Sequence, residues 1–168
     1  MSTDGTSATD APSGTLPRYD ITTDPTRLDI PAIHAFLTHS YWAKRIPIAT
    51  VRRAIKHSVC VSAILEGQQV GFARVVTDHA TFAYLADVYV LEAHRGNGVA
   101  RAMLDALFAL PELQGLRRLL LVTRDAHGLY EKLGFTSLAH PARFMERHNP
   151  NAYSLADAHP EHRDEAPG

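Results

Sequence analysis

The spacing of apolar and polar residues changes several times between residues 18 and 150. Apolar residues at helical spacing, together with helix start and stop signals, predict helices at 30–39, 47–57, 97–110 and 125–133. Segments rich in β-branched, aromatic and other apolar residues predict strands at 59–66, 69–77, 81–91, 117–123 and 135–138. This order, two helices and three strands followed by helix, strand, helix and strand, predicts a mixed α/β (α+β) domain.

The lengths of the connections predict how the strands pair. The first two strands are separated only by Glu66-Gly67-Gln68, which is typical of a hairpin, and the third follows after a short turn. Later strands are joined through helices and can therefore run parallel to their neighbours. We expect a central mixed sheet flanked by helices and antiparallel in its first half. Asp125 is expected to cap the last helix, and Gly134 to end it.

The two ends of the chain differ in composition from the middle. Residues 1–17 consist mostly of Ser, Thr, Asp, Gly and Pro, and the last residues are polar as well. Such segments bury too little apolar surface to offset the entropy of ordering. We therefore predict a disordered N-terminal tail at 1–17, one domain at 18–150 and a flexible C-terminal tail at 151–168.

Composition and charge exclude several classes of protein. The 168 residues contain 17 Lys and Arg against 18 Asp and Glu, so no basic excess predicts nucleic-acid binding. The single cysteine, Cys60, forms no intramolecular disulfide and lies in an apolar run, where a buried side chain is expected. No apolar stretch predicts a membrane span, and the first residues lack the features of a secretory signal. A cytoplasmic protein that does not associate with membranes is predicted.

A glycine-containing turn at the start of the third predicted helix indicates an anion site. Gly96 and Gly98 flank Asn97 there, although each glycine costs about 1 kcal/mol relative to alanine within a helix. Without side chains, the backbone N–H groups of the turn can approach a bound anion at the positive end of the helix dipole. Arg95 and Arg101 flank the turn and suit phosphate oxygens. A nucleotide is the weaker interpretation, because Arg101 replaces the third glycine of the dinucleotide motif and no Gly-Lys-Ser/Thr follows.

Two segments resemble motifs of the GNAT N-acetyltransferase family. Arg95-Gly96-Asn97-Gly98-Val99-Ala100 resembles the Arg/Gln-x-x-Gly-x-Gly/Ala motif, which holds the pyrophosphate of coenzyme A in that family. Further along, 126–135 resembles the Ala-x-x-Leu-Tyr-x-x-x-Gly-Phe signature, with a predicted strand between the two motifs. The resemblance extends over most of 18–145. It implies the GNAT fold, with a sheet that is splayed at the cofactor-binding strand, and acetyl-CoA as co-substrate.

The resemblance also implies which residues bind coenzyme A. Thr123 departs from the pattern, because many members carry an asparagine there that contacts the pantetheine arm. A threonine retains one hydrogen bond but not two. The implied cofactor-binding residues are Val88, Tyr89, Val90, Arg95, Gly96, Asn97, Gly98, Val99, Ala100, Arg101, Thr123, Ala126 and Tyr130.

Two side chains are candidates for catalysis. By resemblance, Tyr130 protonates or hydrogen-bonds the sulfur of coenzyme A, the alternative being a ring that only packs between helix and strand. Backbone N–H groups at Val88–Val90 correspond to those that stabilise the oxyanion. Asp87 is the only acid in an apolar strand, which suits a general base or a group that orients the amine. The alternative for Asp87 is a structural contact with backbone or an arginine.

The acceptor site is less well defined by the sequence. Acidic groups suit a cationic amine, whereas Arg74 and Arg124 suit an amine that carries a carboxylate, and both alternatives stay open. Asp78 and His79 are further candidates for the acceptor cleft, and His127 for a proton relay. The acceptor-binding candidates are Tyr41, Trp42, Arg74, Tyr84, Asp87 and Arg124.

The sequence therefore predicts an N-acetyltransferase that transfers acetyl from acetyl-CoA to a primary amine of a small molecule or peptide by direct attack. The alternative from another class is a catalytically silent acyl-CoA-binding or sensor module with the same fold. No metal is expected, because none of the ten histidines stands in a metal-ligand spacing. A monomer or a homodimer is expected.

Overall fold

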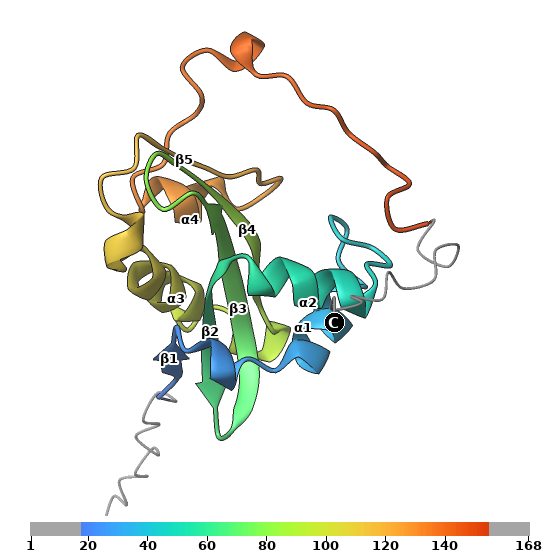
Figure 1. The fold of residues 1–168 in the computed structure, drawn as a ribbon. Helices are drawn as coiled ribbons and strands as arrows, with labels where there is room; N and C mark the ends of the chain where they lie inside the picture. Colours follow the sequence, from blue (N-terminus) through green and yellow to red (C-terminus); the bar gives the residue numbers. More distant parts are fainter. Residues whose placement is uncertain (1–17, 155–168) are drawn as a thin grey trace, which may run out of the picture.

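A five-stranded sheet with the order β1-β2-β3-β4-β5 forms the centre of the protein (Figure 1). The computed structural model describes residues 18–154, so residues 1–17 and most of the predicted C-terminal tail lie outside the described residues. Neighbouring strands are antiparallel except β4 and β5, which are parallel, as expected for strands joined through a helix. The strands are β1 (Asp20–Thr22), β2 (Val59–Leu65), β3 (Gln68–Thr77), β4 (Phe82–Val90) and β5 (Arg118–Leu120).

Helices cover both faces of the sheet (Figure 1). The helices α1 (Ile30–Leu37) and α2 (Ile48–Lys56) pack on one face, and α3 (Val99–Phe108) and α4 (His127–Glu131) on the other. The helices are those that the apolar spacing predicts. Short 3-10 turns occur at Pro25–Arg27, Glu92–His94, Pro111–Leu113 and Pro141–Arg143.

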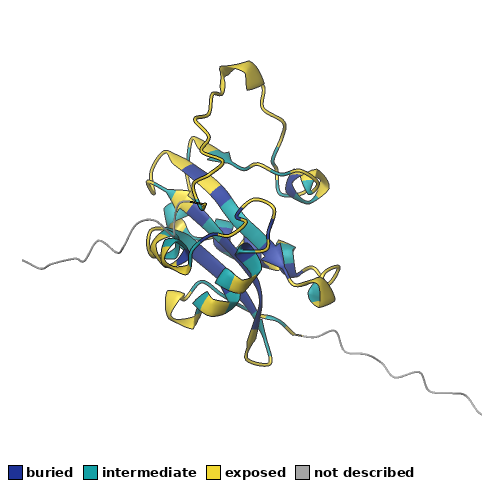
Figure 2. Cartoon of the chain, turned by 90° about the vertical axis from the view of Figure 1, so that its right-hand side faces the viewer, coloured by how far each residue is buried: buried dark blue, intermediate teal, exposed yellow. Residues whose placement is uncertain are grey.

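Each face of the sheet has its own apolar core, seen as dark blue strands between the helices in Figure 2. The core on the α1 side contains Ile33, Leu37 and Phe72, none of them more than 2% exposed. The core on the α3 side contains Met103, Leu104 and Leu107 of α3, all fully buried. The alternating residues of β2 and β3 supply both cores, so the sheet is buried on its two faces.

β4 and β5 separate after a short stretch of pairing. They are in register only from Phe82 against Arg118 to Tyr84 against Leu120. Beyond this point β5 ends, whereas β4 continues to Val90, and no strand among residues 18–154 pairs with it on that side. This confirms the predicted splay, and it leaves backbone N–H and C=O groups of β4 free to bind a ligand.

A bulge in β4 changes the direction of Asp87. β3 and β4 pair one to one except at Ala73, which lies against both Asp87 and Val88. The backbone of Asp87 is left-handed, with φ 53°, a conformation that aspartate tolerates better than most residues. Leu85 faces the core on the α3 side, yet Tyr89, four residues later, faces the core on the α1 side. The bulge thus places the Asp87 carboxylate on the α1 side instead of in the apolar core beneath α3.

Two sequence predictions were wrong, and one strand was missed. Residues 135–138 form no strand, because the Phe135 N–H bonds to the Tyr130 carbonyl at the end of α4 and its ring packs against Phe108. Asp125 does not cap α4, because the Thr123 hydroxyl accepts the Ala126 N–H instead. The three-residue strand β1 was not predicted, since a segment so short has no measurable periodicity.

Candidate functional site

A cleft of about 700 Å³ opens where β4 and β5 separate. Its wall on one side is β4, and on the other the residues after β5 together with α4. The cleft brings together residues that were predicted for two different ligands. From the cofactor set it includes Val88, Tyr89, Val90, Arg95, Ala100, Thr123, Ala126 and Tyr130, and from the acceptor set Tyr41, Trp42, Arg74, Tyr84 and Asp87.

The glycine-containing turn lies at the start of α3. Gly96 and Gly98 have φ values of 76° and 75°, in the left-handed region that glycine adopts without strain. Gly98 is the N-cap residue of the ten-residue helix, and its cap is made by no side chain. A side chain built at either glycine would meet no atom within 4 Å, so the space beside the turn is open. The first turn of α3 is thus open beside its two glycines, as an anion site at a helix N-terminus would require.

The two arginines of the motif have different partners. Arg95 lines the cleft and donates from Nε to the Val90 carbonyl at 3.0 Å, which holds it against the end of β4. Arg101 donates from Nε to both oxygens of Asp105, at 2.9 and 2.7 Å. It also reaches the Lys132 carbonyl, so its guanidinium links α3 to the end of α4. A contact between Arg101 and phosphate stays a prediction.

The turn is supported by a residue that the sequence analysis missed. The Tyr19 hydroxyl, just before β1, lies 3.4 Å from Nδ2 of Asn97 and 3.2 Å from Nδ1 of His94. The Tyr19 and His94 rings also meet edge to face. A lone tyrosine next to a polar tail carries no sequence signal, because the contact joins positions far apart in the chain.

Tyr130 lies at the bottom of the cleft, on α4. It is 8% exposed, and its ring packs edge-on against Phe135. Burial raises the pKa of the Tyr130 phenol above its ordinary value, and the nearby Tyr41 contributes to the same shift. The phenol is therefore protonated at neutral pH and available as a hydrogen-bond donor. The Thr123 hydroxyl, by contrast, accepts the Ala126 N–H at 3.1 Å, so it fixes the start of α4.

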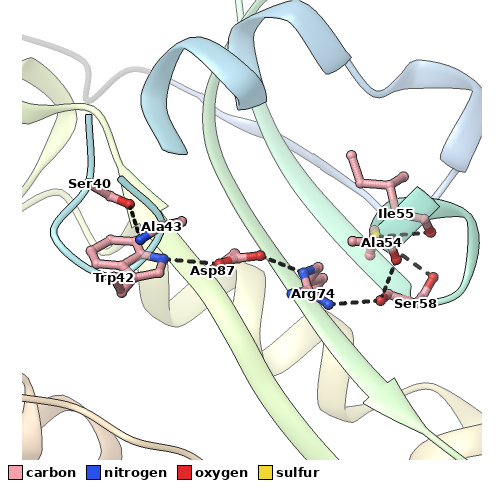
Figure 3. A network of polar contacts seen from close by, with 9 residues as sticks. Ser40, Trp42, Ala43, Ala54, Ile55, Ser58, Arg74 and Asp87 are labelled. Atoms are coloured by element: carbon pink, nitrogen blue, oxygen red, sulfur yellow. Dashed lines mark hydrogen bonds and ion pairs between the residues drawn. The ribbon is translucent and has the colours of Figure 1, made fainter. Parts of the chain in front are cut away.

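A chain of polar contacts crosses the other end of the cleft (Figure 3). Nε of Arg74 on β3 lies 2.5 Å from Oδ2 of Asp87, and Nε1 of Trp42 donates to Oδ1 of Asp87 at 3.0 Å. Arg74 also donates to the Ser58 hydroxyl, which in turn donates to the Ala54 carbonyl at the end of α2. Both oxygens of Asp87 thus have a donor, and the side chains of Asp87 and Arg74 are only 9% and 18% exposed.

Aromatic rings surround this polar pair. Phe36 of α1 stacks on Tyr89 with centroids 3.8 Å apart, and Tyr41 meets Trp42 edge to face. The Arg124 guanidinium lies 4.0 Å from the centroid of the Tyr41 ring. Burial raises the pKa of Tyr89 to about 12, so this residue also remains neutral.

Two aromatic residues of the cleft escaped the sequence analysis. Phe36 was read only as a core position of its helix, and Tyr153 was assigned to the predicted C-terminal tail. Tyr153 is partly buried and packs against the core on the α1 side. The residues around Tyr153 gave no signal, because Ala152 and Ser154 on either side of it are small and exposed.

Other candidates lie elsewhere. Asp78 and His79 form the turn between β3 and β4, where the Asp78 carboxylate accepts the N–H groups of Ala80, Thr81 and Phe82. A hydrogen bond from the Thr81 hydroxyl and these N–H bonds hold the pKa of Asp78 well below its usual value. Neither residue lines the cleft, so their predicted place in it was wrong. His127 is exposed at the first position of α4 and does not line the cleft either.

Within residues 18–154 no three His, Cys, Asp or Glu side chains are grouped so that they can hold a metal ion. Within the same range no helix is long and apolar enough to cross a membrane.

Comparison with known proteins gives consistent matches. Residues 56–137 match the family model of the acetyltransferase (GNAT) domain. A curated protein of Gibberella zeae, provisionally named an acetyltransferase, is 36% identical over 135 residues, covering 68% of this chain and 76% of the relative.

Solved structures agree with this result. A GNAT-family protein from Xanthomonas campestris pv. campestris is 52% identical, with a TM-score of 0.80 over 83% of this chain and 99% of that chain. A protein from Clostridium acetobutylicum, named as an acetyltransferase and solved with acetyl-CoA, has the same fold, with a TM-score of 0.58, 20% identity, and coverage of 78% and 95%. The motifs at 95–100 and 126–135, the splayed sheet and these relatives together place the chain in the GNAT acetyltransferase family.

Proposed function

We propose that this protein is an acetyl-CoA-dependent N-acetyltransferase that transfers acetyl to a primary amine of a small molecule or peptide. The observation that carries the proposal is one cleft lined by Tyr130, by the Arg74–Asp87 pair, and by Arg95 and Ala100, which flank the glycine turn. A donor and an acceptor bound in one cleft can react directly, without a covalent enzyme intermediate.

The donor half of the cleft suits coenzyme A. The N–H groups at Gly96–Gly98 and the start of α3 suit the pyrophosphate, with Arg95 nearby. The unpaired edge of β4 between Tyr84 and Val90 suits the amide groups of the pantetheine arm, which can pair with it as a strand would. The bound acetyl-CoA of the Clostridium acetobutylicum protein supports this choice of donor.

The reaction requires three events around the thioester carbon. The amine nitrogen attacks this carbon, and a β4 N–H at Val88–Val90 stabilises the oxyanion that forms. The bond from carbon to sulfur then breaks, and the leaving thiolate takes a proton from the Tyr130 phenol or is stabilised by it. The nitrogen loses a proton, and amide and free coenzyme A result. A buried and protonated Tyr130 suits this role.

Asp87 is proposed to orient the amine and to take its proton. Its two oxygens accept from Arg74 and Trp42, which hold the carboxylate in a fixed position. An amine with a pKa of about 10.4 must lose a proton before it attacks, which costs roughly 4 to 5 kcal/mol at pH 7. Asp87 is the carboxylate on the acceptor side of the cleft to which that proton can pass.

Calorimetry with acetyl-CoA and a Gly98→Glu variant tests the proposal. The glutamate places bulk and negative charge in the turn, so we expect wild type to bind and the variant to lose binding. Gly115→Glu is the matched control, because Gly115 also has a positive φ, 69°, with open space beside it, and lies beyond the other end of α3. Failure of folded wild type to bind acetyl-CoA would overturn the proposal. Binding without acetyl transfer to any amine would instead indicate a sensor module.

A further inference from the structure

The charged side chains at the acceptor end of the cleft are paired. Arg74 and Asp87 neutralise each other, and Arg74 also donates to the Ser58 hydroxyl. Asp125 lies 3.8 Å from Arg124, which does not itself line the cleft but lies over the ring of Tyr41, a lining residue. Within residues 18–154, the side chains that line this end therefore include no cation without an acidic partner.

The rest of that end is largely aromatic. The rings come from α1, the loop after it, β4 and the segment after α4, so parts distant in sequence converge on one space. Aromatic faces attract an ammonium group and pack against apolar bodies. The rings that line the cleft besides Tyr130 are Phe36, Tyr41, Trp42, Tyr84, Tyr89 and Tyr153.

We infer that the acceptor is a primary amine carried on an aromatic or other apolar body, with no carboxylate or phosphate. This inference rests on the proposed function and specifies its substrate class. An acidic acceptor would have to bury its charge beside Asp87 without a free cation, or break the pair between Arg74 and Asp87, and either is costly. A monoamine with an apolar body buries no negative charge beside Asp87 and leaves the Arg74–Asp87 pair intact.

Tyr153 completes the aromatic wall. The segment that carries it passes over the outside of the molecule after α4 and returns to the α1 side (Figure 1). Local bonds shape its end, since Asn149 accepts from the N–H groups of Asn151 and Ala152. Tyr153 is the partly buried residue of this turn, so its ring anchors the segment at the cleft.

A matched set of amines tests the inference. We would compare 2-phenylethylamine, L-phenylalanine and L-phenylalaninamide, which share a ring and differ in the group next to the amine. Acetylation at saturating acetyl-CoA gives kcat/KM, and calorimetry gives binding to the protein with and without coenzyme A. We expect kcat/KM for 2-phenylethylamine to exceed that for L-phenylalanine by about tenfold or more. L-Phenylalaninamide, which lacks the carboxylate, should recover most of this difference.

Variants connect the preference to the residues. Asp87→Asn leaves Arg74 without its partner, so binding of phenylalanine relative to phenylethylamine should rise, whereas Asp20→Asn, in the exposed pair with Arg27, should leave the ratio unchanged. Tyr153→Ala should weaken binding of phenylethylamine several-fold, and Tyr153→Phe should not.

The results that would contradict this acceptor class differ from those that would contradict the proposed function. Equal or better binding of phenylalanine, or no binding of phenylethylamine to the protein, would overturn the inference. Binding of phenylethylamine by a chain that binds no coenzyme A would overturn the proposed function and leave the acceptor class standing.

Discussion

The guanidinium of Arg74 and the carboxylate of Asp87 face each other across two adjacent strands, with Nε and Oδ2 only 2.5 Å apart. The contact exists because the bulge in β4 brings Asp87 to the face of the sheet on which Arg74 lies. A regular strand would have directed the carboxylate into the core beneath α3, where a charge has no partner. A local irregularity of the backbone thus creates the polar end of the cleft.

Asp87→Asn separates catalysis from donor binding. The amide keeps the shape but loses the charge that orients the amine and accepts its proton, so we expect kcat/KM for the amine to fall by roughly 100-fold. Affinity for acetyl-CoA should hardly change, because the glycine turn proposed to bind it follows β4 and makes no contact with the Arg74–Asp87 pair. Steady-state kinetics and calorimetry measure the two effects.

The control for this variant is Asp20→Asn, which removes a charge from an exposed ion pair and should alter neither quantity. If the Asp87→Asn variant acetylated the amine as fast as wild type does, Asp87 would have no part in the mechanism.

Tyr130→Phe tests the proton donor. The ring and its packing on Phe135 remain, so acetyl-CoA binding should persist while kcat falls by about 100-fold. Burial raises the pKa of this phenol above its ordinary value, so it is protonated at neutral pH. Its contribution to stability is complete below the unfolded-state pKa and is lost as the pH rises through the raised folded-state pKa.

The pH profile of kcat provides a separate measurement. In wild type we expect no decline attributable to the phenol below pH 10, and Tyr130→Phe should abolish any decline seen above it. A variant that retains full kcat would assign Tyr130 a packing role only.

Much of the proposed donor half of the cleft was predictable from the sequence, because its signals are local. Glycines at 96 and 98 have positive φ values, and Tyr130 stands in a short motif that ends at Gly134, also with positive φ. Backbone conformation of this kind restricts which residues fit, so it leaves a recognisable pattern over a few positions.

The acceptor half was less predictable, because it depends on long-range contacts. Asp87 was noticed as an acid in an apolar strand, but its pairing with Arg74 depends on a one-residue bulge. Tyr153 belongs to a polar stretch that its composition assigns to a tail, and only the path of the chain brings it to the cleft. The spacing of apolar residues along the chain carries no information about such long-range contacts.

Cys60 should be inert toward thiol reagents in the native protein. Burial raises its pKa to about 12, so at pH 8 only about one molecule in ten thousand carries the thiolate. We expect no modification by iodoacetamide at pH 8 by mass spectrometry, and complete modification in urea. Cys60→Ala should retain acetyl transfer, as direct attack requires; rapid native labelling or loss of transfer would instead support an acetyl-cysteine intermediate.

The packing of α3 on the sheet depends on a glycine beneath a methionine. A Cβ at Gly71 would lie 3.0 Å from both Sδ and Cε of Met103, and 3.3 Å from the backbone oxygen of Tyr89. The methionine end can move, but the backbone oxygen is fixed in the sheet, so Gly71→Ala should destabilise the protein by about 1 to 3 kcal/mol. Urea unfolding measures this change.

A second glycine and a double variant show whether crowding is the cause. Gly128 in α4 has no atom within 4 Å of a built Cβ, so Gly128→Ala should be neutral or stabilising by up to about 1 kcal/mol. Met103→Val removes the two atoms that the new methyl group meets. In the Gly71→Ala background its cost should therefore be smaller than in wild type, and strictly additive costs would show that the methionine is not the obstacle.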